Sequence, residues 1–237
     1  MFNQLLLQIT VGNTPVQPMQ NPITTEKTLS IWELISSGGI GGNIIMLSLL
    51  VLSIAAVYII IERYLAIKKA SKEDANFMNQ IKDFILDGKI DAAKSLCKMN
   101  QTPVAKMVEK GISRIGKPLS DIGTAVETTG KLELNKLETN LSTLATISGA
   151  APMIGFLGTV IGMILVFHKM AAAGGNIDVE MLSEGIYTAM ITTVAGLIVG
   201  IIAYVAYNIL VAKIEKIVFV MEARTTEFLD ILHEPAA

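Results

Sequence analysis

Apolar residues in this chain gather in three long stretches that contain no charged residue and no histidine. They run over residues 44–61, 141–167 and 185–212. A helix needs roughly 20 mostly apolar residues to cross the hydrocarbon core of a bilayer. The first stretch is close to this length and can extend upstream, because residues 38–43 are also uncharged. The pattern therefore predicts three transmembrane helices, over residues 38–61, 141–167 and 185–212.

Beside these stretches, apolar residues recur at helical spacing. One stripe follows Pro118, a residue favoured in the first turn of a helix, and leads into the second span without a helix breaker. Its members are Ile122, Val126, Leu132, Leu137, Leu141 and Leu144. A second stripe follows the third span and consists of Ile214, Ile217, Val218, Met221, Phe228 and Ile231. Both spans are thus expected to continue as helices beyond the membrane, beside short helices in residues 62–140. The predicted fold class is all-α.

Basic residues beside the first span predict the orientation of the chain. Arg63, Lys68, Lys69 and Lys72 follow this span directly, whereas the segment before it contains only Lys27. Lys and Arg are enriched in the cytoplasmic flanks of membrane helices, so the N-terminus is expected outside. Residues 1–37 then form an outer arm with a short helix near residues 30–36, and residues 168–184 form an outer loop. Residues 62–140 and 213–237 are expected on the cytoplasmic side.

Composition agrees with a membrane protein, since 51% of the residues are hydrophobic, 17% are charged and the mean hydropathy is +0.54. The net charge of -2 provides no basic surface for nucleic acid. The single cysteine, Cys97, excludes an intramolecular disulfide and lies in an amphipathic segment, where it is expected to pack in the core. No basic residue precedes the short apolar residues 5–7, so no cleaved signal peptide is expected. Paired carboxylates, histidine clusters and nucleophile triads are absent from the sequence, which argues against an enzyme.

Small and hydroxyl-bearing residues form one stripe on the second span and one on the third. The second span carries Thr146, Gly149, Pro152, Gly155, Thr159 and Gly162, and the third carries Ala189, Thr193, Gly196, Gly200 and Ala203. Such stripes let helix backbones approach closely, and threonine hydroxyls can bond across helices. Helix packing and pore lining both remain open for these residues. The spans contain no carboxylate, histidine, lysine or arginine, so this chain alone cannot be a complete proton relay.

The second span contains APMIGFLGTVIGM, residues 151–163, which resembles the signature of the ExbB, TolQ and MotA-type proton channel subunits. Glu62 and Arg63 after the first span, and TTVAGL at residues 192–197 in the third, match the family as well. The resemblance implies a homopentamer in the bacterial inner membrane. Its second and third helices would surround two copies of an ExbD- or TolR-like protein with a single membrane span. That partner's intramembrane aspartate would carry the protons, and no other cofactor is expected.

The resemblance also implies roles for individual residues. Thr159 and Thr193 are expected to face the pore near the partner's aspartate, with Thr146, Thr188 and Thr192 along the same pathway. The residues expected to shape the wall and pack the helices are Pro152, Gly155, Gly158, Gly162, Gly196 and Gly200. An ExbB-like motor would energise a TonB-like protein that opens outer-membrane transporters. A TolQ-like or other motor of the same family, or a non-conducting membrane scaffold, would fit the same motifs.

At one position the sequence departs from the family. ExbB and TolQ proteins typically have a glutamate near the outer start of the third span, where this chain has Thr188. Glu184 lies one turn earlier, but a glutamate at a membrane boundary is usually solvated. Glu62 and Arg63 are read as topological signals just inside the membrane. His168 and Lys169 are read as interfacial residues at the outer end of the second span, with proton entry through His168 as the alternative.

Overall fold

The structure, a computed structural model, describes residues 39–72, 76–172 and 179–233. Over these residues the chain forms helices and no strand. The helices are α2 (Gly39–Ala70), α3 (Phe77–Leu86), α4 (Ile90–Met99), α5 (Pro103–Ile112), α6 (Leu119–Glu138), α7 (Leu141–Ala172) and α8 (Val179–His233). The arm predicted for residues 1–37, with its short helix near residues 30–36, lies outside the described residues.

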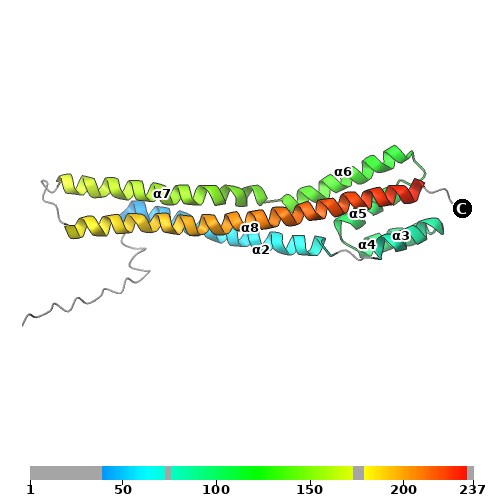
Figure 1. The fold of residues 1–237 in the computed structure, drawn as a ribbon, viewed down its shortest axis with the longest axis horizontal. Coiled ribbons are helices and arrows are strands. Elements are labelled where there is room, and N and C mark those ends of the chain that lie inside the picture. The colour runs from blue at the N-terminus through cyan, green and yellow to red at the C-terminus, as the bar shows by residue number, and fades with distance from the viewer. Residues whose placement is uncertain (1–38, 73–75, 173–178, 234–237) are drawn as a thin grey trace, which may run out of the picture.

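Three of these helices are long enough to cross a bilayer. Helices α2, α7 and α8 run side by side along one half of an elongated molecule (Figure 1). Helix α7 has 32 residues, about 48 Å at 1.5 Å per residue, whereas a bilayer core is about 30 Å thick. All three contain windows that are apolar enough for a membrane span. This confirms the predicted all-α, polytopic membrane fold.

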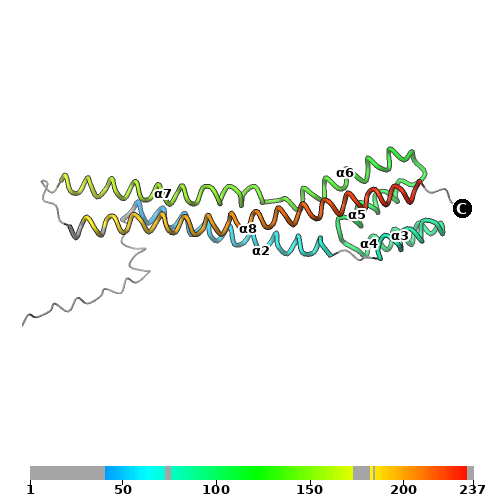
Figure 2. The backbone as a smooth tube through the Cα atoms, viewed as in Figure 1, coloured from blue at the N-terminus to red at the C-terminus, as the bar shows by residue number. Residues whose placement is uncertain are grey.

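The third span continues far beyond the membrane, as the sequence predicts. Helix α8 has 55 residues, which corresponds to about 80 Å. Figure 2 shows it as one tube that reaches from the α7 end of the molecule to the small helices at the other end. One helix therefore belongs to both the apolar half and the charged half of the protein.

The second span also extends beyond the membrane, but its helix is interrupted. Helix α6 ends at Glu138 and α7 begins at Leu141, and the chain bends between them (Figure 1). At the bend Asn140 adopts the left-handed backbone conformation, with φ 63°. Asparagine tolerates this conformation better than most residues do, because its short polar side chain can bond locally. The expectation of an unbroken helix was wrong here, since the apolar stripe runs through the bend unchanged.

The charged half is a bundle of α3 to α6 around the end of α8 (Figure 1). Its core contains Phe77, Val108, Val126 and Phe228, all at most 2% exposed. Cys97 is 2% exposed and belongs to the same core, as predicted. Burial raises the pKa of its thiol to about 12, so this cysteine is a packing residue with little thiolate at neutral pH.

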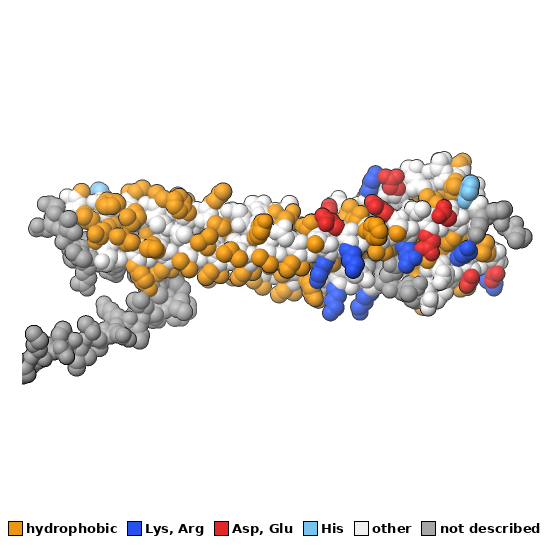
Figure 3. Space-filling model, in the orientation of Figure 1, with side chains coloured by type: hydrophobic (Ala, Val, Ile, Leu, Met, Phe, Trp, Pro, Cys, Tyr) orange, Lys and Arg blue, Asp and Glu red, His pale blue; other side chains and the backbone are white. Residues whose placement is uncertain are grey.

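Charge divides the surface along the long axis. Figure 3 shows orange apolar side chains over the α2, α7 and α8 half, and blue and red side chains over the bundle. Exposed residues in the apolar half include Ile54 on α2, Phe156 on α7 and Ile201 on α8, each more than half accessible. A soluble surface does not carry such a continuous apolar band, so this half is the membrane-embedded part.

Candidate functional site

The small-residue stripes of α7 and α8 face each other, and their backbones touch. A methyl group added at Gly155 would lie 2.6 Å from the carbonyl oxygen of Thr192. One added at Gly196 would lie 2.5 Å from the carbonyl oxygen of Ala151 and 2.9 Å from the Cα of Gly155. Distances this short do not occur between real atoms of these kinds. Glycine is therefore required at both positions for the two helices to approach this closely.

The contact continues in both directions along the two helices. Toward the α7–α8 connection, Gly162 lies against Ala189, whose Cβ would be 2.7 Å from a methyl group on the glycine. Gly158 lies against the side chain of Thr192. Toward the bundle, Gly200 packs on the ring of Pro152. All six residues assigned to helix packing from the sequence thus lie in the α7–α8 interface: Pro152, Gly155, Gly158, Gly162, Gly196 and Gly200.

Pro152 also alters the backbone of α7. A proline has no N–H, so the carbonyl of Ser148, four residues earlier, receives no helical hydrogen bond from this position. A methyl group on Gly200 would lie 3.1 Å from that same carbonyl oxygen. The absence of a side chain at Gly200 therefore accommodates both the proline ring and the Ser148 carbonyl.

Three threonine hydroxyls meet in the middle of this interface. Thr159 and Thr193 are hydrogen-bonded to each other across the two helices. The Thr159 hydroxyl also lies 3.1 Å from the Ala189 carbonyl oxygen, and the Thr193 hydroxyl lies 3.1 Å from that of Gly155. The result is a chain of hydroxyls between one carbonyl on each helix.

Thr192 lies between the same two carbonyl groups. Its hydroxyl is 2.7 Å from the Ala189 oxygen and 3.1 Å from the Gly155 oxygen. Thr192 is 4% exposed, whereas Thr159 and Thr193 are half-buried. Thr192 is thus an internal packing contact, whereas Thr159 and Thr193 keep part of their surface accessible to solvent or to a neighbouring helix.

Of the remaining predicted pathway residues, Thr146 lies away from this cluster, whereas Thr188 adjoins it on α8. Thr146 is exposed on α7, about 20 Å along the helix from Thr159, and its hydroxyl donates to the Ser142 carbonyl at 2.9 Å. Thr188 is half-buried, one turn before Thr192 on α8. The side chain of Glu184, weighed above as a substitute for the family glutamate, lies outside the described residues. His168 and Lys169 are exposed near the end of α7.

Arg63 does more in the structure than mark the orientation of the chain. It is 7% exposed, is paired with Glu62, and donates from Nη1 to the Lys136 carbonyl oxygen at 2.9 Å. Lys136 lies in the last turn of α6, where carbonyl groups have no partner within the helix. Arg63 thus ties the end of α2 to the end of α6, directly before the bend. Sequence reasoning missed this contact because a basic residue after a span satisfies the orientation rule whether or not it is buried.

Comparison with known proteins agrees with these features. The sequence model of the MotA/TolQ/ExbB proton channel family matches residues 99–223, just over half of the chain. The TolQ protein of the Tol-Pal system of Pseudomonas aeruginosa is 26% identical over 220 residues, which cover 86% of this chain and 93% of that protein.

Two shorter matches have higher identity. A putative biopolymer transport ExbB homologue of Methanothermobacter thermautotrophicus is 36% identical over 48% of this chain and 40% of its own length. A putative ExbB-like protein 2 of Helicobacter pylori is 42% identical over 44% of this chain and 63% of its own length. The family match includes α7 and the threonine-bearing part of α8, together with α5 and α6 of the bundle. This chain therefore belongs to the MotA/TolQ/ExbB proton channel family.

Proposed function

We propose that this chain is an ExbB-like subunit of a motor driven by the proton-motive force in a bacterial inner membrane. Five copies would surround two copies of an ExbD- or TolR-like protein whose single span carries an aspartate. The motor would energise a TonB-like protein, and through it outer-membrane transport. The observation that carries the proposal is the linked pair of hydroxyls on Thr159 and Thr193, at membrane depth in spans that contain no carboxylate, histidine, lysine or arginine.

The geometry of this pair suits proton handling. Three hydrogen-bonding contacts join Thr159, Thr193 and the carbonyls of Ala189 and Gly155, but two hydroxyls have only two protons to donate. The chain therefore has two arrangements, one donating to Ala189 and the other to Gly155. Switching between them turns the hydroxyl donors around without creating a charge in the membrane. A neighbouring ionised carboxyl group would take the hydroxyl proton that otherwise goes to the Ala189 or Gly155 carbonyl, and a protonated carboxyl group would donate to a threonine oxygen.

Proton flow would be coupled to movement through the charge on the partner's aspartate. Protonation from the outer side neutralises the partner's aspartate and removes the penalty for moving it along an apolar wall. Each proton that crosses the membrane releases roughly 2.3 kcal/mol per 100 mV. A few protons thus supply enough free energy for a conformational step in an attached protein.

Replacing Thr159 by valine tests the hydroxyl role. Valine keeps the shape of threonine and removes its hydrogen bonds, so Thr159→Val should still assemble. We expect proton uptake by proteoliposomes that contain the complex with its native partner to slow by at least about tenfold, which is less than the roughly 10²- to 10⁴-fold contribution of a positioned proton-transfer group. The matched control is Thr128→Val, because the Thr128 hydroxyl is exposed on the cytoplasmic bundle and bonds only within its own helix, to the Thr124 carbonyl at 2.7 Å. Unchanged uptake in Thr159→Val would instead support a scaffold whose stripes only hold helices together.

Native mass spectrometry of the complex, gently extracted from its own membrane, tests the assembly. The expected species contains five copies of this chain and two copies of a small protein with one aspartate-bearing span. A stable monomer or dimer without such a partner would contradict the motor.

A TolQ-like role in envelope maintenance is the second candidate. It is favoured by the match to TolQ over 93% of that protein's length, whereas the two ExbB-type matches cover 40% and 63% of theirs. Identification of the protein that co-purifies with the motor, TonB-like or TolA-like, separates the two.

A further inference from the structure

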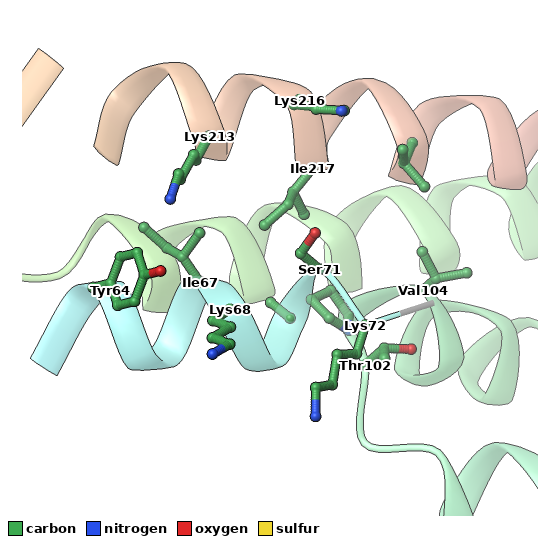
Figure 4. Close-up of a pocket in the computed structure, with 13 residues that line it drawn as sticks. Tyr64, Ile67, Lys68, Ser71, Lys72, Thr102, Val104, Lys213, Lys216 and Ile217 are labelled. Carbon is green, nitrogen blue, oxygen red and sulfur yellow. The ribbon is translucent and has the colours of Figure 1, made fainter. Parts of the chain in front are cut away.

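A basic cavity lies where the membrane-embedded half meets the cytoplasmic bundle. It has a volume of about 630 Å³ and opens between the end of α2, the middle of α8 and the first turn of α5 (Figure 4). Lys68 and Lys72 line it from the α2 side, and Lys213 and Lys216 line it from α8. A cavity of this size can hold a small-molecule group.

Every charged group among the described residues of this lining is a lysine. The acidic residues of this part of α8, Glu215 and Glu222, line a separate hollow on the opposite side of the helix. Glu73 and Asp74 follow Lys72 in the sequence but lie outside the described residues. Over the described part of the chain, α8 thus presents a basic face to the cavity and an acidic face away from it.

Polar groups that suit a phosphate accompany the lysines. Thr102 is 5% exposed and caps α5, where its hydroxyl oxygen accepts from the Ala105 N–H at 3.3 Å. Pro103 has no N–H, so Val104 carries the first-turn N–H group that has no acceptor within the helix. Such a turn favours a negative charge in front of it. In Figure 4 the Ser71 hydroxyl points from the α2 side toward α8.

The lysines border the cavity with long, flexible side chains. Lys213 extends from α8 toward α2, with its ammonium nitrogen 4.5 Å from the centre of the Tyr64 ring (Figure 4). The ammonium groups of Lys68 and Lys72 point away from α8 in this view. All four lysines are exposed, so their side chains are free to turn toward an anion.

The cavity continues directly into the apolar surface of the membrane-embedded half. On α2 the exposed residues before it are Val57, Tyr58, Ile61 and Leu65, and on α8 Ile209 is exposed four residues before Lys213. Tyr64, between these groups, has the amphipathic ring typical of a membrane interface. An acyl chain can therefore lie along α2 while its headgroup occupies the cavity.

We propose that this cavity binds the phosphate headgroup of an anionic phospholipid from the leaflet at the charged end of the protein. The lysines, the first turn of α5 and the hydroxyls recognise the phosphate, and the exposed face of α2 receives the acyl chains. A soluble phosphate compound would use the headgroup contacts but would gain nothing from that apolar face. The site does not depend on the motor function, since a scaffold with the same fold would bind the same lipid.

The test is a lipid titration followed by native mass spectrometry of the full chain in detergent, in its purified oligomeric state. The probes are phosphatidylglycerol and phosphatidylcholine with identical acyl chains. We expect tighter binding of phosphatidylglycerol, and affinity for it at least about tenfold lower after four exposed lysines become glutamines, since each lysine near an anionic surface contributes measurably. The substitutions are Lys68→Gln, Lys72→Gln, Lys213→Gln and Lys216→Gln.

A matched variant controls for net charge. It replaces four lysines of the bundle by glutamine, and these four do not line the cavity: Lys94, Lys98, Lys110 and Lys117. Its affinity for phosphatidylglycerol should equal that of the unmodified protein. Equal losses in both variants, or equal binding of the two lipids by the unmodified protein, would overturn the proposal. So would binding of glycerol phosphate as tight as that of the lipid, because the ligand would then be a soluble phosphate.

Discussion

At the scale of single residues, hydroxyls and glycines in the α7–α8 interface have different tasks. Gly155 and Gly196 bring the backbones together, and this close approach is what lets Thr159 and Thr193 reach each other. The sequence left packing and pore lining open as alternatives for these stripes. The structure shows that the glycines pack, while a pore role for the threonines stays a prediction that the valine substitution tests.

Glu133 is paired with two lysines in the charged bundle. Its carboxylate accepts hydrogen bonds from Lys106 at 2.7 Å and Lys136 at 2.6 Å, and its side chain is 9% exposed. Burial by itself would raise the pKa of Glu133, but the two lysines outweigh it and lower the pKa. A carboxyl whose pKa is lower in the folded protein stabilises the fold above its unfolded pKa, about 4.3, and loses that contribution as the pH falls through the folded value.

We therefore expect Glu133→Gln to lower the free energy of unfolding by about 1–2 kcal/mol at neutral pH, because two charge-assisted hydrogen bonds are lost. The difference from the unmodified protein should shrink as the pH falls below about 4.3 and vanish once the pH has fallen past the lowered pKa of the folded state. Chemical unfolding in detergent over a range of pH measures both effects. Glu127→Gln is the control, since its ion pair with Lys131 is exposed on both sides and should contribute little. A loss that stays constant down to acidic pH would show that the carboxylate charge is not what stabilises the bundle.

At the scale of elements, the α7–α8 pair depends on the absence of side chains at its contact points. Gly196→Ala should lower thermal stability by about 1–3 kcal/mol, as overpacking does, because the new methyl group would collide with the Ala151 carbonyl. Gly149→Ala on the same pair of helices is the control, since a methyl group there meets nothing within 4 Å. That variant should keep or slightly raise stability, because alanine favours a helix over glycine by about 1 kcal/mol. Equal stability of Gly196→Ala and Gly149→Ala would contradict the close approach of the α7 and α8 backbones.

The bend between α6 and α7 depends on the backbone conformation of one residue, Asn140. Asn140 is exposed, so its importance lies in its backbone, with φ 63°, and not in side-chain packing. Asn140→Val should destabilise the protein by roughly 1–2 kcal/mol, because left-handed backbone is costly for other L-residues. Asn140→Gly should leave stability unchanged or raise it slightly, since glycine has no such cost. Thermal unfolding of both variants measures these changes in stability. If Asn140→Val were as stable as the unmodified protein, the chain would run straight through this point without left-handed backbone.

At the scale of the whole molecule, the charged end sets the orientation. Lys and Arg gather where the apolar half ends and over the charged half (Figure 3), beside the last turn of α2 and the middle of α8, which predicts a cytoplasmic bundle and an outer N-terminus. Cys97 is unreactive because its thiol is buried with a pKa of about 12, so single cysteines can be introduced without removing it.

We expect His168→Cys, near the outer end of α7, to react with a membrane-impermeant maleimide in intact spheroplasts. Met99→Cys, at a position 83% exposed in the bundle, should react only after the membrane is opened. The unmodified protein should remain unlabelled in both conditions. The reverse pattern would invert the topology.

The sequence by itself determined the number of spans, the fold class and the family. These properties follow from local composition: an uncharged stretch of sufficient length must be a helix in a bilayer, because every backbone group has to be bonded within it. The extension of α8 past the membrane was equally predictable, since its apolar stripe keeps helical spacing along the whole stretch.

Only the tertiary structure decided which stripes meet and what the buried charges do. Thr159 and Thr193 are 34 residues apart and bond through a contact between two helices that no local pattern specifies. Arg63 reaches the Lys136 carbonyl across 73 residues, and four lysines from distant segments share one cavity. Periodicity shows which face of a helix is apolar or small, but the neighbour of that face depends on how all the helices pack at once.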